Sequence, residues 1–519
     1  MPLPEPRQLA AICVPGVAAL MLCVIELTTR SLWLDEGATA AITAQHGTAL
    51  WQAISADGGN MLAYYVGMHI WVGIAGHSAL ALRLPSVAAD CFSAVCVALL
   101  GMRLFGDRRA ALAAGLLTAV SIPLVFWGQD ARGYAALVAA ISASFLALMV
   151  ILESDPERPP PPLAVAAYVL VTTLALYIGG VALLVIPAQV IAARLVGRRL
   201  RTVVGALTVV AALCVPLLVL AVHQGGPSLS SVPPFSSTTL AQGAIAMVSG
   251  GLAPQFHISN LTVIATAAGV ALVLTGVTLS SIALLRRSES PWVLMPGLWV
   301  VVPAVLALAA AVIGVPMELP RAATMLIPGV ALVLAWLLFR SGWDPPFGWG
   351  WLVLILALRL IVLVPNYGTS PEPWHAVVKR VLSVSRPSDC VAFYPQDGRM
   401  TFDYYRRGMK DGHTNAPRSV LPDAPWGHIS TYLDAYTLPI RVTMSDWAVR
   451  CQRLWLISAK PGSPGTDSAS RARNSGLGWL EQGLKHRFVP VSSQRYGWSS
   501  TILVREYRQL GKPDRRSGS

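Results

Sequence analysis

Residues 134–152 read YAALVAAISASFLALMVIL and contain no charged side chain. A helix needs about 20 mostly apolar residues to cross a bilayer, so this stretch predicts a membrane span. Other apolar stretches of similar length occur on both sides of it. Together they predict eleven spans, near 9–27, 81–101, 110–126, 134–152, 162–179, 181–196, 202–221, 258–284, 291–313, 322–339 and 349–365.

The composition places the whole chain in the same class. Of the 519 residues, 54% are hydrophobic and 13% are charged, and the mean hydropathy is +0.58. Soluble proteins carry about 25% charged residues, so a single water-soluble globule is excluded. The apolar content also excludes a mainly disordered chain. We therefore predict a polytopic α-helical membrane protein.

Charge is distributed unevenly along the chain. Residues 1–365 carry 17 Lys and Arg against 14 Asp and Glu, whereas residues 366–519 carry 22 against 12. The basic end either keeps a domain soluble or contacts anionic lipid headgroups or an anionic polymer. Arg outnumbers Lys by 34 to 5, which indicates a GC-rich bacterial genome.

Arginines in short loops predict the orientation. They follow the second, sixth, eighth and tenth spans, at 103–109, 194–201, 286–287 and 340, on the same side as Arg7 when spans alternate. Because cytoplasmic loops are enriched in Lys and Arg, the N-terminus is predicted to be cytoplasmic. The first apolar segment lacks a small-residue cleavage site and should remain as a span. Eleven spans then place the C-terminal region outside the bacterial cytoplasmic membrane.

This topology divides the chain into parts. We predict a transmembrane domain over 1–365 with a long external loop at 28–80, a soluble extracytoplasmic α/β domain over 366–510, and a disordered tail over 511–519. In the soluble part, helices expected at 374–385, 402–407 and 470–484 alternate with strands expected at 390–394, 454–458 and 500–505. Such alternation is typical of α/β domains. No nucleotide-binding glycine pattern follows these strands, so the domain is expected to bind or dock.

Two of the seven cysteines lie in the predicted external domain. Cys390 and Cys451 each open a predicted strand, and the compartment is oxidising. We predict a disulfide between neighbouring strands, with two free thiols as the alternative. The other cysteines lie in spans, where they serve as small hydrophobic residues.

Two adjacent carboxylates lie just outside the first span, in Trp33-Leu34-Asp35-Glu36-Gly37. Neighbouring carboxylates repel, which raises the pKa of one of them. A raised pKa suits a general base that works near neutral pH. The alternative is a solvated loop start or a helix cap.

Further charged residues lie at predicted external span ends. Asp130 and Arg132 stand in the second external loop, and Arg83 and Arg321 each begin a span. An arginine at the outer face can hold a phosphate bidentately. The alternatives are a local Asp130–Arg132 charge pair and simple snorkelling of the arginines.

The external loop at 28–80 also carries polar residues before its paired tyrosines. Asp57 and Asn60 fit either hydrogen bonding to a polyol or an ordinary turn. Tyr64 and Tyr65 follow them directly.

Four of these motifs occur in the order seen in membrane glycosyltransferases of the GT-C class. They read Trp33-Leu34-Asp35-Glu36, then Ala81-Leu82-Arg83-Leu84-Pro85-Ser86, then Gly128-Gln129-Asp130-Ala131-Arg132-Gly133-Tyr134, then Pro320-Arg321 ahead of Ile327-Pro328-Gly329. The sequence most resembles bacterial relatives of protein O-mannosyltransferases and of the lipid A aminoarabinose transferase. The resemblance covers about residues 28–340.

The resemblance implies an inverting glycosyltransferase. Such an enzyme moves a sugar from a polyprenyl-phosphate donor to an acceptor hydroxyl on the outer face of the membrane. The acceptor is a cell-envelope glycan, a glycolipid or a protein, the other partners are membrane lipids, and no nucleic acid is expected. No cofactor is certain; a divalent cation is the one option.

The resemblance also implies roles for individual residues. Asp35 maps onto the base, and Glu36 and Asp130 onto acids that hold the acceptor, the sugar or a metal. From the chemistry of the residues themselves, we assign donor phosphate binding to the arginines at 83, 132 and 321, and acceptor or sugar binding to Asp57, Asn60, Tyr64 and Tyr65.

Topology places five of these residues at external span ends, so we predict that they converge on one cavity that opens to lipid. The five are Asp35, Glu36, Asp130, Arg132 and Arg321. We expect Asp35 and Arg321 to lie within roughly 15 Å, a separation that one phospho-sugar could bridge.

Two other function classes remain open on the sequence: a transporter of lipid carriers or solutes, and a non-catalytic scaffold of envelope assembly with the same fold. Transporters usually place coupling residues near the midplane, whereas the carboxylates here lie at the outer face.

Overall fold

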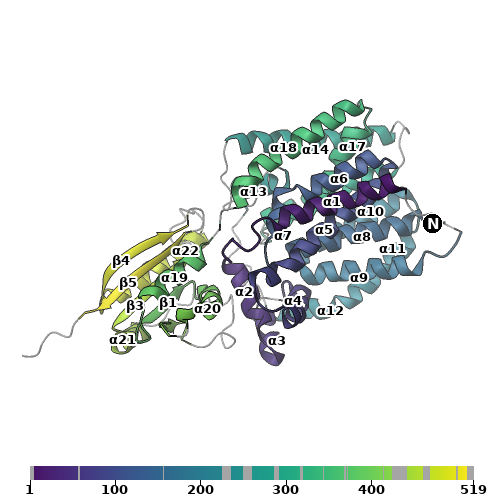
Figure 1. Ribbon diagram of the computed structural model, residues 1–519. Coiled ribbons are helices and arrows are strands. Elements are labelled where there is room, and N and C mark those ends of the chain that lie inside the picture. Colours follow the sequence, from purple (N-terminus) through teal and green to yellow (C-terminus); the bar gives the residue numbers. More distant parts are fainter. Residues whose placement is uncertain are drawn as a thin grey trace, which may run out of the picture. The chain divides into compact units, whose positions relative to one another are not determined.

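The computed structural model describes residues 5–56, 59–155, 157–224, 235–248, 260–285, 291–315, 319–342, 344–367, 370, 372–412, 414–423, 441–459, 468–497 and 501–510. The chain forms two compact units (Figure 1). The helical unit comprises residues 1–29, 58–225 and 232–369. The sheet unit comprises residues 30–57, 226–231 and 370–519.

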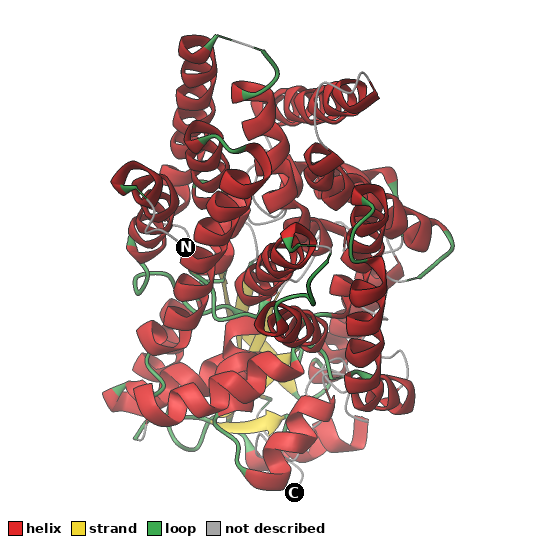
Figure 2. Cartoon of the chain, turned by 90° about the vertical axis from the view of Figure 1, so that its right-hand side faces the viewer, coloured by secondary structure: helices red, strands yellow, loops and turns green. Residues whose placement is uncertain are grey.

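The helical unit consists of helices and short 3-10 turns (Figure 2). Its α-helices are α1 (Pro6–Val24), α4 (Leu62–Ala75), α5 (Ala79–Phe105), α6 (Arg108–Ala119), α7 (Ile122–Gly128), α8 (Tyr134–Glu153), α9 (Pro162–Ile178), α10 (Ile186–Val196), α11 (Leu200–Leu213), α12 (Val215–Gln224), α13 (Ser237–Val248), α14 (Asn260–Leu285), α15 (Leu294–Val312), α16 (Leu319–Ala322), α17 (Ile327–Phe339) and α18 (Pro345–Tyr367). The 3-10 turns are Gly180–Val185, Pro291–Val293 and Ala323–Leu326.

Each predicted span coincides with an apolar helix or a bent pair of helices. Among the described residues, five helices are long and apolar enough to cross a membrane, or seven spans if each bent pair counts as one. The bent pairs are α6 with α7, at 60°, and α11 with α12, at 44°. The remaining predicted spans correspond to shorter apolar helices, so eleven crossings stay a prediction. Helix α4 is a further short apolar helix, inside the predicted external loop, that we did not expect.

Proline explains both bends. Pro123 and Pro216 each occupy the second position of the helix that follows the break. Proline has no N–H to donate to the preceding turn, and its ring crowds the carbonyl four residues earlier. The helix therefore ends and restarts in a new direction.

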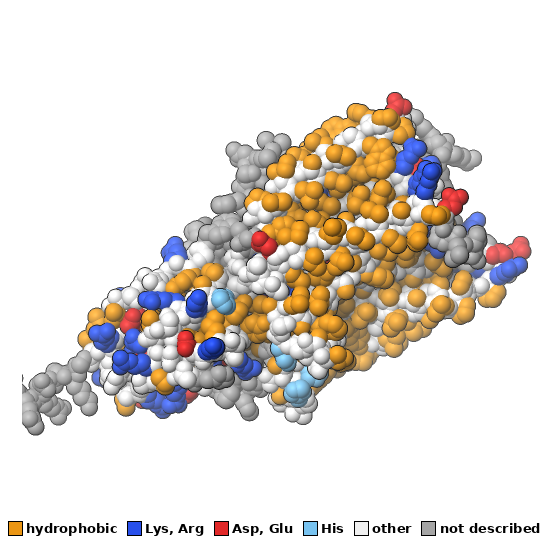
Figure 3. Space-filling view, in the orientation of Figure 1, with side chains coloured by type: hydrophobic (Ala, Val, Ile, Leu, Met, Phe, Trp, Pro, Cys, Tyr) orange, Lys and Arg blue, Asp and Glu red, His pale blue; other side chains and the backbone are white. Residues whose placement is uncertain are grey.

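The outer surface of the helical unit is apolar. In Figure 3, hydrophobic side chains cover most of the visible face of this unit, and charged side chains gather mainly at one end of it and over the sheet unit. Large side chains such as Leu163 (81% exposed) and Ile361 (67% exposed) point outward. A soluble protein rarely exposes so continuous an apolar surface, so this face suits lipid.

The sheet unit contains a five-stranded sheet with the order β2-β1-β3-β5-β4. Its strands are β1 (Cys390–Tyr394), β2 (Arg418–Leu421), β3 (Arg453–Ala459), β4 (Phe488–Tyr496) and β5 (Ile502–Gln509). β1 pairs in parallel with β2 and β3, whereas β5 runs antiparallel to β3 and β4. The predicted strands β1, β3 and β5 are confirmed, and β2 and β4 were not predicted.

Helices cover both faces of the sheet. The unit contains α2 (Leu34–Thr43), α3 (Gly47–Ala56), α19 (Trp374–Val384), α20 (Gly398–Gly408), α21 (Arg441–Arg450), α22 (Ser468–Leu484) and a 3-10 turn, Lys410–Gly412. The predicted helices at 374–385, 402–407 and 470–484 are thus confirmed as α19, α20 and α22, and α21 was not predicted. The predicted tail at 511–519 lies outside the described residues.

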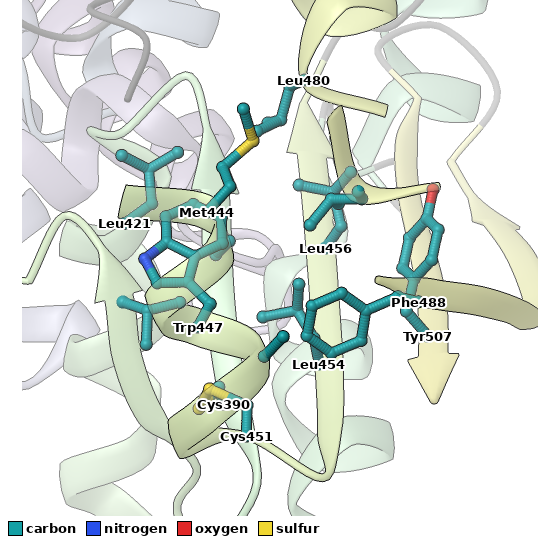
Figure 4. Close-up of a cluster of buried hydrophobic side chains, with 14 of the residues drawn as sticks. Cys390, Leu421, Met444, Trp447, Cys451, Leu454, Leu456, Leu480, Phe488 and Tyr507 are labelled. Atoms are coloured by element: carbon teal, nitrogen blue, oxygen red, sulfur yellow. A yellow bond between two sulfur atoms is a disulfide. The ribbon is translucent and has the colours of Figure 1, made fainter. Parts of the chain in front are cut away.

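Alternation along β1 divides the core. Cys390, Ala392 and Tyr394 pack with side chains of α21 and α22, such as Trp447 and Leu480 (Figure 4). Val391 and Phe393 belong to the cluster on the other face, with α19, α20 and Leu34 of α2. Successive strand residues point to opposite faces, so a fully buried strand needs apolar residues at every position.

The predicted disulfide between Cys390 and Cys451 is present, with 5.6 Å between the Cα atoms. Cys390 opens β1, and Cys451 precedes β3, the neighbouring strand. Beside it, Arg453 forms an ion pair with Asp389 (2.6 Å). Partial burial lowers the pKa of Arg453, but hydrogen bonds and charge from Asp389 and Glu506 outweigh it, so this pKa lies above its usual value. These contacts tie the two strands at one end.

Residues 30–57 belong to the sheet unit, although the sequence predicts them as part of an external loop of the transmembrane domain. The physical reason is burial: Leu34 is part of the apolar core that contains Trp374 and Phe393. This segment brings the candidate base into the unit built mainly by the C-terminal residues.

Candidate active site

Asp35 and Glu36 lie in the first turn of α2. The preceding residue, Trp33, is extended, with φ −96° and ψ −179°. Carboxylates are stabilised near a helix N-terminus by the helix dipole, so the helix-start interpretation describes their local setting. Asp35 is half-buried and Glu36 is 1% exposed. A position at a helix start does not exclude a role as general base, because the half-buried Asp35 side chain is still partly accessible.

Residues of the C-terminal part hold the start of α2. The amide of Leu34 donates to Glu372 Oε2 (2.9 Å), and the amide of Leu32 donates to the hydroxyl of Tyr405 (2.6 Å). Neither Glu372 nor Tyr405 was predicted as a functional residue. No local sequence signal links them to the first loop, since they are separated from it by more than 300 residues.

In the helical unit, the predicted second-loop residues form a buried turn between α7 and α8. Asp130 and Arg132 are 2% and 4% exposed. Arg132 Nη1 donates to the hydroxyl of Tyr65 (2.8 Å), and the Arg132 amide donates to the carbonyl of Asp130 (2.8 Å). Tyr65 comes from α4, the unexpected apolar helix. The structure therefore joins a predicted phosphate-binding arginine to a predicted acceptor-binding tyrosine.

Close packing holds α4 against this turn. A Cβ atom at Gly133 would lie 3.3 Å from Tyr64 Cβ and 3.2 Å from Ile178 Cγ2. A larger residue would push the backbone away from α4. Tyr64 and Tyr65 are both buried, and their rings lie 5.9 Å apart. Asn60 is exposed, and Asp57 lies outside the described residues.

Arg321, from α16, reaches the same part of the helical unit. Its Nη1 donates to the hydroxyl of Tyr134 (2.8 Å), and its Cζ lies 5.6 Å from the centre of the Tyr134 ring. The Tyr134 ring is in turn 4.0 Å from the ring of Trp127. A guanidinium near an aromatic face is held by cation–π attraction as well as by its hydrogen bond. Tyr134 was quoted in the sequence motif but not predicted as a functional residue.

Arg83 lies in α5 and is 1% exposed. Its Nη1 donates to the carbonyl of Leu27 (2.5 Å), just beyond α1. One turn later, the Ser86 hydroxyl donates to the carbonyl of Arg132 (3.3 Å). The motif that contains Arg83 therefore supports the turn that carries Arg132. The role of Arg83 at a donor phosphate stays a prediction.

The helical unit thus gathers three of the four sequence motifs around the turn at 128–134. The residues that take part come from α4, α5, α8 and α16, and they include three predicted arginines at 83, 132 and 321. Asp35 and Glu36 belong to the other unit. The predicted convergence of all five residues, and the distance from Asp35 to Arg321, therefore stay predictions.

Within the part of the chain that the structure describes, no three or more His, Cys, Asp and Glu residues form a group that could hold a metal ion. Glu36 and Asp130, the predicted metal ligands, belong to different units.

No family model and no curated protein matches this sequence. Solved structures match its fold. ArnT from Cupriavidus metallidurans bound to undecaprenyl phosphate is 12% identical, with a TM-score of 0.59 over 95% of this chain and 97% of that chain. The archaeal oligosaccharyltransferase AglB from Archaeoglobus fulgidus, in complex with an inhibitory peptide and a dolichol-phosphate, is 13% identical, with a TM-score of 0.55 over 96% and 74%.

A further structure of the Archaeoglobus fulgidus oligosaccharyltransferase, in complex with Zn and sulfate, is 11% identical, with a TM-score of 0.51 over 95% of this chain and 72% of that chain. At these identities the likeness establishes the fold alone. The GT-C resemblance drawn from the motifs is confirmed at that level.

Proposed function

We propose that this protein is an inverting glycosyltransferase that moves a sugar from a polyprenyl-phosphate donor to an acceptor hydroxyl. The observation that carries the proposal is the arginine cluster of the helical unit. Arg132 and Arg321 come from separate elements and are held by tyrosines of α4 and α8, on a unit with a lipid-compatible surface. A lipid-linked phosphate needs this combination of an apolar surface and guanidinium groups. Structures of the same fold bind undecaprenyl phosphate or dolichol-phosphate.

In the proposed reaction, the carboxylate of Asp35 takes the proton of the acceptor hydroxyl. The acceptor oxygen then forms a bond to the anomeric carbon of the sugar. The bond between that carbon and the phosphate oxygen breaks, its electron pair stays on the phosphate, and polyprenyl phosphate leaves. Attack from the opposite side inverts the anomeric configuration. Because the leaving group is already an anion, a general base contributes more than a general acid.

The remaining predicted residues take supporting roles in this proposal. Arg132 and Arg321, with Arg83, stabilise the donor phosphate in the ground state and as it leaves. Glu36 and Asp130 orient the sugar or share a divalent cation with the donor, and treatment with EDTA distinguishes these two options. Asp57, Asn60, Tyr64 and Tyr65 face the acceptor or the sugar, with Tyr65 also holding Arg132.

The proposal includes a location. Eleven spans place the N-terminus in the cytoplasm and the sheet unit outside the cytoplasmic membrane of a bacterium, where the donor lipid and an envelope glycan, glycolipid or protein acceptor meet. Arg108→Cys and Arg407→Cys test it, because both positions are exposed. A membrane-impermeant thiol reagent added to intact spheroplasts should label position 407 and not 108, relative to the parent protein. Labelling of both positions, or of 108 alone, would contradict the topology.

Asp35→Asn tests the reaction. We expect turnover to fall at least about 100-fold, the usual scale for loss of a general base, with undecaprenyl phosphate binding unchanged. Turnover is measured as sugar transfer in membranes of a deletion strain that expresses each variant, with the envelope glycans read by mass spectrometry. Asp423→Asn, at an exposed carboxylate of the sheet unit, is the matched control. Full transfer by Asp35→Asn would favour a scaffold or a transporter.

A further inference from the structure

The helix that carries Asp35 lacks an N-terminal cap of its own. The first four N–H groups of any α-helix have no partner within the helix, and a side chain at the N-cap position usually satisfies one of them. The N-cap residue of α2 is Trp33, which makes no side-chain capping bond. The start of α2 therefore depends on another part of the chain.

Glu372 supplies the missing cap from a distant place in the sequence. Its Oε2 accepts the amide N–H of Leu34, the first residue of α2 (2.9 Å), and the indole N–H of Trp374 (2.8 Å). The Glu372 side chain is fully buried, where a carboxylate is costly without hydrogen bonds. A negative charge at this end of a helix also interacts favourably with the helix dipole. Glu372 thus fixes both the position and the direction of the first turn.

Tyr405 and Ser370 hold the chain just before the helix. The amide of Leu32 donates to the Tyr405 hydroxyl (2.6 Å), and the amide of Ser31 donates to Ser370 Oγ (2.8 Å). The Ser31 hydroxyl in turn accepts the amide N–H of His375 (3.0 Å). These three hydrogen bonds fix the backbone of residues 31 and 32, which precede α2, against the sheet unit.

Close contact with α20 holds the other side of Asp35. A Cβ atom at Gly37 would collide with the Thr401 hydroxyl and would lie 3.0 Å from Thr401 Cα. Thr401 and Tyr405 are four residues apart and therefore lie on one face of α20. Figure 1 shows α2 and α20 side by side within the sheet unit, in agreement with their contacts. Only glycine fits at position 37 at this separation.

We propose that Glu372 and Tyr405, with the Gly37–Thr401 contact, are positioning residues that hold the carboxylate of Asp35 for proton transfer. The inference rests on the proposed function of Asp35. Asp35 stands between Leu34, which Glu372 holds, and Gly37, which Thr401 contacts, so its backbone is fixed from both sides. The C-terminal part of the chain is then a structural component of the active site, beyond binding or docking. A displacement of about 1 Å in a catalytic group can cost about 100-fold in rate.

Tyr405→Phe is the sharpest test, because it removes one acceptor and keeps the ring that lies 5.3 Å from His375. We expect transfer in deletion-strain membranes to fall about 10-fold and undecaprenyl phosphate binding to stay unchanged. Hydrogen–deuterium exchange of the full chain in nanodiscs should speed up in the peptide that contains residues 31–37. Tyr404→Phe, the same change one residue away, is the control and should leave exchange in that peptide unchanged.

Glu372→Ala should have the larger effect, about a 100-fold loss of transfer, and Glu372→Gln a smaller one because it keeps an acceptor oxygen. Slow exchange in β1 and β3 shows that the sheet is folded. If Glu372→Ala unfolds the sheet, the proposal is tested with Glu372→Gln and Tyr405→Phe instead.

A compensating pair tests the contact between Gly37 and Thr401. Gly37→Ala should reduce transfer at least about 10-fold, and addition of Thr401→Gly should restore part of it, since removal of the threonine side chain makes room for the new methyl group. Slow exchange in β1 and β3 of both variants shows that the sheet is folded, so that the change in transfer reports the position of Asp35.

The proposal is overturned if transfer by Tyr405→Phe and Glu372→Gln equals that of the parent, whether or not exchange in residues 31–37 changes. It is also overturned if Thr401→Gly restores nothing to Gly37→Ala. The proposed function fails in a different way: Asp35→Asn would then transfer sugar at the parent rate.

Discussion

The two units of this molecule are built in opposite ways. Most of the helical unit consists of apolar stretches that are recognisable in the sequence by themselves, and each of these contributes one helix or one bent pair. The sheet unit joins residues 30–57 to residues 370–519, so its core depends on chain segments that are far apart. This difference in construction coincides with a difference in the candidate functional residues. The candidate base belongs to the unit assembled from distant segments, and the candidate phosphate-binding arginines belong to the helical one.

The units also satisfy their buried polar groups differently. In the helical unit, Arg132 and Arg321 donate to tyrosine hydroxyls, which are neutral acceptors. In the sheet unit, the buried Glu372 accepts N–H groups of the backbone and of an indole. We therefore expect changes in the helical unit to alter donor binding and changes in the sheet unit to alter turnover or the stability of that unit.

The largest expected effect concerns the disulfide. Replacement of Cys390 and Cys451 by serine should destabilise the sheet unit by about 2–4 kcal/mol, because the cross-link restricts the unfolded chain. Hydrogen–deuterium exchange in β1 and β3, recorded at increasing denaturant concentration, measures this loss. Exchange in α5 and α8 should not change. Equal loss in both units would show that they unfold together and would break the comparison.

Arg321→Ala should weaken donor binding by about 1.5–3 kcal/mol, the scale of a hydrogen bond to a charged group, which corresponds to roughly 10- to 150-fold in the dissociation constant. Binding of undecaprenyl phosphate to the protein in nanodiscs measures it. Arg321→Lys keeps the charge and should recover part of the affinity, though not the bidentate geometry. An unchanged dissociation constant together with a large fall in turnover would move Arg321 to the catalytic step.

Asp389→Asn should destabilise the sheet unit by about 1–2 kcal/mol, because it removes the charge that pairs with the partly buried Arg453. Asp411→Asn is a control at another carboxylate of the same unit. Tryptophan fluorescence during chemical denaturation gives the midpoint of each variant, and the midpoint of Asp389→Asn should be lower than that of Asp411→Asn. Identical midpoints would mean that the pair contributes nothing measurable.

The smallest effect is expected for Tyr134→Phe, about 0.5–1.5 kcal/mol, or a few-fold in donor affinity. The change removes the hydroxyl that holds Arg321 and keeps the ring beneath the guanidinium. Tyr177→Phe, which removes the hydroxyl of a different helical-unit tyrosine, is the control. A loss of turnover with unchanged undecaprenyl phosphate affinity would contradict the assignment of this region to the donor.

The sequence by itself determined the helical nature of the chain and the strands with a strong apolar pattern. These features are local: an apolar run of span length predicts a helix, and Cys390–Tyr394 is buried along its whole length. For Cys390 and Cys451 the sequence left a disulfide and two free thiols open, and the fold, which brings together residues 61 positions apart, decided for the disulfide. β4 escaped prediction because Pro490 interrupts its short apolar start and residues 492–495 are polar. The short strand β2, with four residues, escaped for lack of length.

Only the tertiary structure decided which segments work together. It assigned residues 30–57 to the sheet unit, through bonds such as that from Leu34 to Glu372 across 338 residues. It also joined Tyr65 to Arg132 and Tyr134 to Arg321. A hydrogen bond between distant residues leaves no periodic pattern in either segment, because each partner looks like an ordinary polar residue until the chain folds. The motifs named Asp35 as the candidate base, whereas the fold alone showed what holds its helix in place.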